Sequence, residues 1–497
     1  MQGKKTYIPK LMYQVHLNSL VPKDNFYRKL DEELDMSFLY KDTARYYGTE
    51  GQESIDPVVF FKICLIGYLN NINSDRKLIE YCSNCLDTRL FMRYDIDESL
   101  PWHSTISRTR QLYGEDVFLS LFRKVLSLCV QKGMIRGKRQ AIDSAFIKAN
   151  ASLDSLIEKE VIADAQVYCD ELNEGSEFKL EIGIKDEEHK SPSNSTHYSP
   201  TDPDARMSVK PGKATHLNFF GQIAVDDSHH VITGAIADFA DKRDSQCLPN
   251  ILGQTIENLK ENEILIDQIV ADTGYSSVDA LQYCEKNNID AYIPNIGSYK
   301  SMREGFRYEK ETDRYICTQG NKAILTFKTI SADKNGHFRK EYRSSASDCS
   351  SCDLKTICIG KSNTKKITDI ANKAYYDQMH EKMQTKYAKK LSKIRKSTVE
   401  PVLGTLINYL NMRKVNSRGI SQASKHVLMA ALCYNLKKYM KYVQRKIKTI
   451  AMEQSVFPLI SGLKRLKRCC YNDFKSFLAL NQPRLNLIWQ RTSNSKN

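Results

Sequence analysis

The sequence has no long apolar run. None of its hydrophobic stretches reaches the roughly 18 residues that a membrane-spanning helix needs, and its first residues contain no apolar core like that of a secretory signal peptide. These absences predict a cytoplasmic protein without a membrane span. In that compartment we expect the 14 cysteines to be free thiols or metal ligands, because disulfides are rare there. The length of 497 residues suggests about two to four domains.

Acidic residues are scarce in the last quarter of the chain. From residue 371 to the end there are 26 Lys and Arg but only 5 Asp and Glu, a net charge of +21 in a chain whose total is +15. A polyanion is the natural partner of such a segment, because cations that neutralise phosphates release counterions. A solvated basic helix is the alternative, and a membrane surface is a weaker one. The bases expected to grip phosphates are Lys437, Lys438, Lys441 and Arg445, ahead of a basic tail over 451–497.

The ten histidines form no pair at metal-ligand spacing, but four cysteines cluster. Cys349 and Cys352 form a C-x₂-C pair, which Cys358 follows and Cys317 precedes. Four thiolates could hold a structural Zn²⁺; reduced, partly buried thiols are the alternative. The cluster lies in residues 297–366, where short stretches rich in Thr, Tyr and Phe predict a small β-rich insertion.

Residues 1–137 are predicted to be helical and to contact DNA. Residues 56–69 begin with a capping Asp and a Pro and continue as a broadly apolar helix. Residues 101–110 predict a later helix, which carries Arg108 and Arg110. Short helices joined by tight turns, with arginines on the last, are compatible with a helix-turn-helix reader of DNA. A plain helical bundle is equally compatible.

The middle of the chain alternates between strand and helix patterns. Its first apolar run contains one acidic residue and is typical of a buried strand. A short turn joins the next two strands, which implies a hairpin. Residues 138–296 with 367–450 therefore predict an α/β sheet of mixed pairing. The expected strands are 140–147, 217–225, 231–237, 264–271 and 290–294, and the expected helices are 246–260, 277–286 and 370–396.

Three acidic residues stand out against these patterns. Asp143 lies within the buried first strand, where a carboxylate is unfavourable unless it is paired or binds a metal. Asp272 ends a later strand, at the sheet edge where ligands gather in α/β folds. Glu400 is a rare acid in the basic region and follows Ser397 and Thr398, which could cap a helix. Carboxylates that meet repel one another unless a cation compensates, and Mg²⁺ prefers such oxygen ligands. The alternatives are a hydrogen-bonded strand-end Asp and an exposed helix-start Glu.

The segments around these acids resemble the three catalytic boxes of bacterial insertion-sequence transposases of the DDE class. The boxes are Ala141-Ile-Asp143-Ser, Ala271-Asp272-Thr-Gly-Tyr275 and Val399-Glu400-Pro-Val-Leu-Gly404. Residues 56–59, 101–107 and 201–207 are similar to further segments of that family, so the resemblance spans about residues 7–440. It implies a ribonuclease H-like α/β core with a mixed five-stranded sheet, an all-α N-terminal domain, and the β-rich insertion before the last catalytic helix.

The resemblance also implies an activity. Asp143, Asp272 and Glu400 would ligate Mg²⁺ or Mn²⁺, with two ions in the site. The protein would bind terminal inverted repeats in double-stranded DNA, cleave there, and transfer the freed strand to target DNA as a homodimer. Two alternatives are a catalytically decayed repressor that only binds DNA and a metal-dependent nuclease without a transfer step.

The bases near Glu400 depart from the family pattern. Many relatives carry a Tyr and an Arg at fixed spacing before the Glu and a Lys after it. This chain has Lys393, Lys396 and Ile407 in those places, although Arg395 lies next to one of them. We therefore expect Arg395 and Lys396 to contact DNA phosphates.

Overall fold

The structure is a computed structural model of the whole chain. It describes residues 16–48, 50, 54–159, 192–209, 214–296, 299, 303–320, 322–332 and 338–446. The predicted tail over 451–497 lies outside these residues. The chain divides into two compact units, Met1–Leu436 and Lys437–Asn497. Among the described residues, no helix combines the length and the apolar character that crossing a membrane requires.

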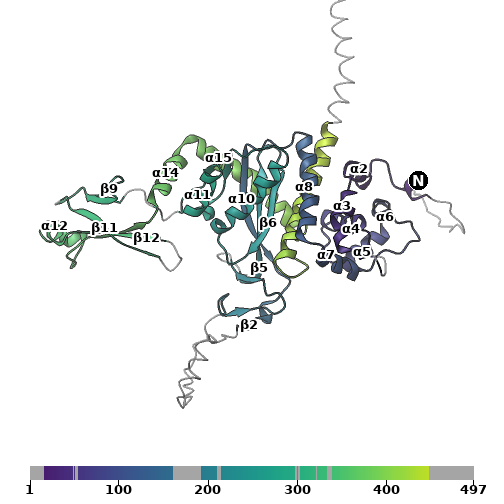
Figure 1. Cartoon of the computed structure of the whole chain (residues 1–497), viewed down its shortest axis with the longest axis horizontal. Coiled ribbons are helices and arrows are strands. Elements are labelled where there is room, and N and C mark those ends of the chain that lie inside the picture. The colour runs from purple at the N-terminus through teal and green to yellow at the C-terminus, as the bar shows by residue number, and fades with distance from the viewer. Residues whose placement is uncertain are drawn as a thin grey trace, which may run out of the picture. The chain divides into compact units, whose positions relative to one another are not determined.

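The described residues ahead of the first long strand are helical, as predicted. The helices are α1 (Leu17–Leu20), α2 (Phe26–Glu33), α3 (Phe38–Thr43), η1 (Ala44–Tyr46), α4 (Pro57–Leu69), α5 (Asp75–Asn84), α6 (Leu86–Met92), α7 (His103–Leu112) and α8 (Glu115–Gln131) (Figure 1). Asp56 caps α4 as expected: its Oδ1 accepts hydrogen bonds from the N–H groups of Val58 and Val59, at 2.7 and 3.1 Å. Because α4 is apolar on all sides and mostly buried, it is a core helix of this region.

A mixed β-sheet forms the middle of the chain, with β1 at its centre. Its strands are β1 (Arg139–Lys148), β4 (Arg206–Ser208), β5 (His216–Asp226), β6 (Ile232–Phe239), β7 (Gln268–Val270) and β8 (Asp290–Tyr292). The order is β6-β5-β1-β7-β8, antiparallel from β6 to β1 and parallel from β1 to β8. The predicted hairpin is β5 and β6. The sheet has six strands where five were predicted, because β4 also pairs with the start of β5.

The strand β7 is shorter than the predicted strand over 264–271. The residues before it complete the end of the preceding helix: the N–H of Ile264 donates to the carbonyl of Leu259 at 3.0 Å. Glu263 has a left-handed φ of 58°, which turns the chain there. Leu265 is 80% exposed. The apolar run therefore contains a helix end as well as a strand, which its composition alone did not distinguish.

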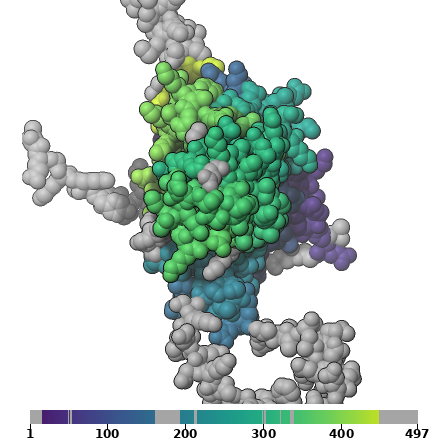
Figure 2. Space-filling model, turned by 90° about the vertical axis from the view of Figure 1, so that its left-hand side faces the viewer, coloured from purple at the N-terminus to yellow at the C-terminus, as the bar shows by residue number. Residues whose placement is uncertain are grey.

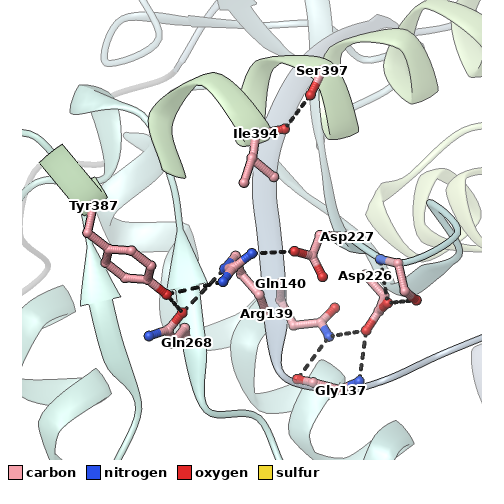
Figure 3. Close-up of polar contacts among 10 residues, drawn as sticks. Gly137, Arg139, Gln140, Asp226, Asp227, Gln268, Tyr387, Ile394 and Ser397 are labelled. Atoms are coloured by element: carbon pink, nitrogen blue, oxygen red, sulfur yellow. Dashed lines mark hydrogen bonds and ion pairs between the residues drawn. The ribbon is translucent and has the colours of Figure 1, made fainter. Parts of the chain in front are cut away.

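Four helices accompany this sheet: α10 (Asp244–Lys260), α11 (Val278–Lys286), α14 (Lys373–Gln384) and α15 (Lys386–Tyr409). α10 and α11 pack against each other (Figure 1), and α15 packs along β1. The expected helix over 370–396 is instead two helices, because Thr385 caps α15 by accepting a hydrogen bond from the N–H of Ala388 at 3.1 Å. A helix start at Ser397 is wrong: the Ser397 hydroxyl donates to the Ile394 carbonyl inside α15 (Figure 3).

A second, all-antiparallel sheet lies between β8 and α14. Its strands are β9 (Phe306–Glu309), β10 (Arg314–Cys317), β11 (Ile324–Ala332), β12 (Phe338–Ser344) and β13 (Lys366–Ile370), in the order β13-β12-β11-β10-β9. Two short helices follow β12, α12 (Ala346–Ser350) and α13 (Lys355–Cys358). In Figure 2 this region contributes to the green surface that faces the viewer. The sheet runs past residue 366, where the insertion was expected to end.

The remaining described elements are small, apart from the helix that ends the first unit. Two-residue strands β2 (Ile157–Glu158) and β3 (His197–Tyr198) pair with each other, and single turns η2 (Leu153–Ser155) and η3 (Thr273–Tyr275) follow β1 and β7. Residues 420–436 are helical at the end of the first unit, and residues 437–446 are helical in the second.

Buried polar contacts join the N-terminal helices to residues 411–426. The Nε2–H of His426 donates to the carbonyl of Asn411 at 2.8 Å, which leaves Nδ1 to accept from the Tyr68 hydroxyl at 2.6 Å. The Asn411 side chain donates to the Gly67 carbonyl at 3.0 Å. These bonds satisfy polar groups that burial would otherwise leave unpaired, so His426 is held as a neutral ring.

This neutral histidine should make the stability of the protein depend on pH. Burial lowers the pKa of His426 from 6.5 to about 4. Between these values the unfolded chain binds a proton that the folded chain excludes, so the free energy of unfolding should fall by about 1.4 kcal/mol per pH unit from pH 6.5 to 4. Chemical unfolding at several pH values measures this slope. H426Q should flatten it, whereas replacing the exposed His216 by Gln should not; equal slopes in all three proteins would refute the assignment.

Candidate active site

Asp143 lies in the central strand, beside the positively charged side chain of Arg395. Its Oδ1 accepts a hydrogen bond from the Ser144 N–H at 2.9 Å, and its Oδ2 accepts one from Arg395 Nη1 at 2.9 Å. Burial raises the pKa of Asp143, the negative charge of Asp272 raises it further, and the two hydrogen bonds oppose the shift. The positive charge of Arg395 offsets the unfavourable interaction between Asp143 and Asp272.

The strand register places Asp272 level with Asp143. β1 and β7 are parallel, and Ala141 pairs with Val270, so the residues two further along each strand stand side by side. Asp272 leaves the end of β7 and starts the turn η3, where its Oδ1 accepts the Gly274 N–H at 2.9 Å. The structure thus brings together the first two predicted acids, 129 residues apart in the sequence.

A third acid, Asp244, joins this pair and was missed in the sequence. It is the first residue of α10, and its Oδ1 accepts a hydrogen bond from the Ser144 hydroxyl. Burial raises its pKa, and the charges of Asp272 and Asp143 raise it further. Its position after a strand could have indicated it. Asp244 follows β6, which runs parallel to β1 and ends at the same edge of the sheet.

Gly274 permits this gathering of acids. A side chain at this position would begin 2.6 Å from Oδ2 of Asp244 and 3.1 Å from Oδ1 of Asp272. The first distance is shorter than any ordinary carbon–oxygen contact, so a larger residue would push the two carboxyl groups apart. The glycine of the Asp272-Thr-Gly-Tyr275 segment therefore accommodates the close approach of Asp244, and a larger residue would displace that side chain.

Arg395 lies between Asp143 and the third predicted acid, Glu400. One guanidinium nitrogen is 2.9 Å from Asp143 and another is 3.6 Å from Glu400. Arg395 is only 9% exposed, whereas more than half of the Glu400 side chain is exposed. Arg395 was expected at a DNA surface; here it is buried among acids. Glu400 was expected at a helix start; it lies inside α15 and meets the other acids through Arg395.

The acids are not arranged around a ready-made metal site. In the part of the chain that the structure describes, no three His, Cys, Asp or Glu side chains stand close enough together to hold a metal ion. Arg395 supplies a positive charge between two of the three predicted ligands. The residue types fit a hard divalent cation, since carboxylate oxygens are its preferred ligands. The guanidinium group of Arg395 lies between two of these carboxylates.

A polar network at the other end of β1 fixes α15 to the sheet. Arg139, the first residue of β1, forms an ion pair with Asp227 and donates to the hydroxyl of Tyr387 at 3.2 Å (Figure 3). Tyr387, in the first turn of α15, donates to Gln268 of β7 at 3.0 Å. Because α15 is held at its start by both strands, the position of Arg395 two turns later is set by the sheet.

The residues expected to bind DNA differ in exposure. Arg108 is exposed on α7, but Arg110 is buried and makes two hydrogen bonds to the carboxylate of Asp75, at 2.9 and 2.7 Å. Arg110 is therefore a structural residue and not a surface contact. Lys396 is exposed on α15. In the second unit Lys438 is half-buried, and Lys437, Lys441 and Arg445 are exposed. The four cysteines predicted to bind zinc lie away from the acids, around one cavity beside the second sheet.

Family comparisons point to one class of protein. A family model described as "Transposase domain (DUF772)" matches residues 15–112, and one described as "Transposase DDE domain" matches residues 316–440. The second match contains Arg395 and Glu400, but Asp143, Asp244 and Asp272 lie outside both matches. The search of the curated proteins returned no match.

A solved structure was also found, the cryo-EM structure of a piggyBac transposase synaptic complex with hairpin DNA. It is 10% identical to this chain, and the alignment covers 84% of this chain and 73% of that one. Its TM-score of 0.31 is too low to support an argument about the fold.

Proposed function

We propose that this chain, a member of the DDE transposases, binds the terminal inverted repeats of an insertion sequence, cleaves DNA there and joins the freed strand to target DNA. One observation supports the proposal: the register of β1 and β7 sets Asp143 level with Asp272, and Arg395 links Asp143 to Glu400 of α15. In open α/β sheets, ligands bind at the carboxyl ends of neighbouring strands, where these carboxylates lie.

The sheet supports a ribonuclease H-like core. Its five main strands have the order β6-β5-β1-β7-β8, with β5 the one strand that runs against the others. This mixed sheet, with β1 central and α15 packed along it, is the arrangement that the resemblance of the catalytic boxes implies. On this proposal, residues 1–137 bind DNA, the sheet β9–β13 that ends at Ile370 forms the insertion, and the first sheet with α14 and α15 carries the chemistry.

Asp143, Asp272 and Glu400 would hold the divalent ions, Mg²⁺ or Mn²⁺. Two such ions, when bound, activate the attacking oxygen and stabilise the leaving one. Asp244 would add negative charge and hold Ser144, so it is a positioning residue for Asp143. Lys396, on the exposed side of α15, would contact DNA phosphates. A cytoplasmic homodimer, with one copy at each end of the element, fits this reaction.

Arg395 has a distinct role in this scheme. It pairs with Asp143 and approaches Glu400, so on this proposal it competes with a divalent ion for both carboxylates. R395Q should therefore raise the affinity for Mn²⁺ in the absence of DNA by roughly ten- to 150-fold, since a charged hydrogen bond that competes is worth about 1.5–3 kcal/mol. Electron paramagnetic resonance of free Mn²⁺ measures the affinity. K396Q, at the exposed neighbour, is the control, and unchanged binding in R395Q would refute this role.

Cleavage and joining of defined DNA test the function. Purified protein is incubated with labelled element ends, a target plasmid and Mg²⁺ or Mn²⁺, and the products are separated on a denaturing gel. Joined end–target products support the proposal. The ion pair of Arg395 with Asp143 favours a second candidate, a decayed transposase that acts as a repressor; binding without cleavage would support it. Cleavage without joined products would identify a nuclease.

A further inference from the structure

We propose that Cys317, Cys349, Cys352 and Cys358 bind one structural Zn²⁺, which fastens the segment between β12 and β13 to the second sheet. This site is separate from the carboxylates, and zinc binding there is independent of the reaction that the protein catalyses.

The four thiols surround one cavity. It has a volume of about 350 Å³, and all four cysteines line it. Cys317 comes from the end of β10, whereas Cys349, Cys352 and Cys358 come from α12, α13 and the turn between them. Residues distant in sequence therefore converge on one space, as they do in zinc sites built from two halves.

The two halves of the site are in contact. Gly320, in the turn after Cys317, has a left-handed φ of 57°, and a Cβ at this position would lie 2.5 Å from the sulfur of Cys352. The sulfur thus lies directly against that turn. On the other side, the hydroxyl of Ser344 lies 3.1 Å from the sulfur of Cys349, as a donor that would stabilise a thiolate.

Apolar packing does not explain why this segment is folded. From Ser345 to Lys366, Cys349 is the only buried residue. The core of the second sheet consists of Tyr315, Leu325, Tyr342 and Ile367, all of which lie outside the segment. Ile357, the middle of α13, is 89% exposed. Small structures that bury so little apolar surface need a cross-link, either disulfides or a metal ion.

The chemistry of the cavity favours a metal ion over disulfides. All four cysteines are free. Four thiolates select Zn²⁺ in tetrahedral geometry, each thiol losing its proton to solvent as the ion binds. The sulfurs do not yet stand at ligand spacing. Cys358 is exposed, and Cys317 and Cys352 are only partly buried, so their side chains have room to rotate inward.

Metal analysis of the full-length chain tests the proposal. The protein is purified under reducing conditions without a metal-binding tag, and its zinc content is measured by mass spectrometry. We expect one Zn²⁺ per chain, and at least a tenfold loss in C352S and in C358S. C85S, at a cysteine outside the cavity, should keep its zinc. Wild-type protein that binds no zinc, or both cavity variants retaining it, would overturn the proposal.

Two measurements on the wild-type protein avoid dependence on the variants. Replacement of zinc by Co²⁺ should produce the intense charge-transfer absorption of cobalt bound by thiolates, and a spectrum without that band would overturn the assignment. Removal of the metal by a chelator should increase hydrogen exchange in residues 345–366 and leave β1 unchanged. A disulfide between these cysteines, or bound iron in place of zinc, would also overturn it.

Discussion

Replacing Asp272 by asparagine should reduce DNA cleavage by about 10³-fold, the effect expected when one group that stabilises charge in a transition state is removed. The asparagine keeps the shape of the side chain and can still accept the Gly274 N–H, so the turn η3 should persist. The charge opposite Asp143, however, is lost. Initial rates of end cleavage in Mg²⁺, together with DNA binding measured by mobility shift, separate chemistry from binding.

The control for this variant is D267N. Asp267 is exposed, ahead of β7 and at the opposite end of that strand. The D267N variant should cleave DNA at the wild-type rate. D143N should be as inactive as D272N, and the double variant little worse than either, because residues that act as a unit are not additive. Cleavage by D272N at the wild-type rate would remove these carboxylates from the mechanism.

Replacing Arg110 by alanine should destabilise the fold by about 3–5 kcal/mol, because it leaves the carboxylate of Asp75 buried without its partner. Both side chains of this ion pair are more than four-fifths buried, and it joins α5 to α7. Thermal unfolding followed by circular dichroism gives the change in midpoint. Hydrogen exchange in α5 and α7 provides the local measurement, independent of unfolding in the second unit and the second sheet.

R108A is the matched control for R110A. Arg108 is exposed on the same helix, so its loss should change stability by less than about 0.5 kcal/mol. If α7 contacts DNA, R108A should weaken binding to element ends while R110A affects folding first. A stable R110A with weakened DNA binding would restore Arg110 as a DNA contact and contradict the structure.

Local patterns determined much of this protein from the sequence alone. The capping Asp56 ahead of α4 and the hairpin of β5 and β6 depend on residues a few positions apart, so they could be predicted. The apolar strand around Asp143 and the strand before Asp272 were also visible. Since parallel strands bring their carboxyl ends to one edge, these two acids could be expected to meet.

The tertiary structure decided which charged side chains are buried and with what partners. Arg395 and Arg110 are indistinguishable from surface bases in the sequence, and only folding places them beside Asp143 and Asp75. Asp244 joined the acids because β6 ends at the same edge as β1 and β7, which the order of strands determines. A run of residues specifies its own helix or strand through short-range sterics and hydrogen bonds. The partner of a buried charge is specified by packing between segments that are distant in the chain.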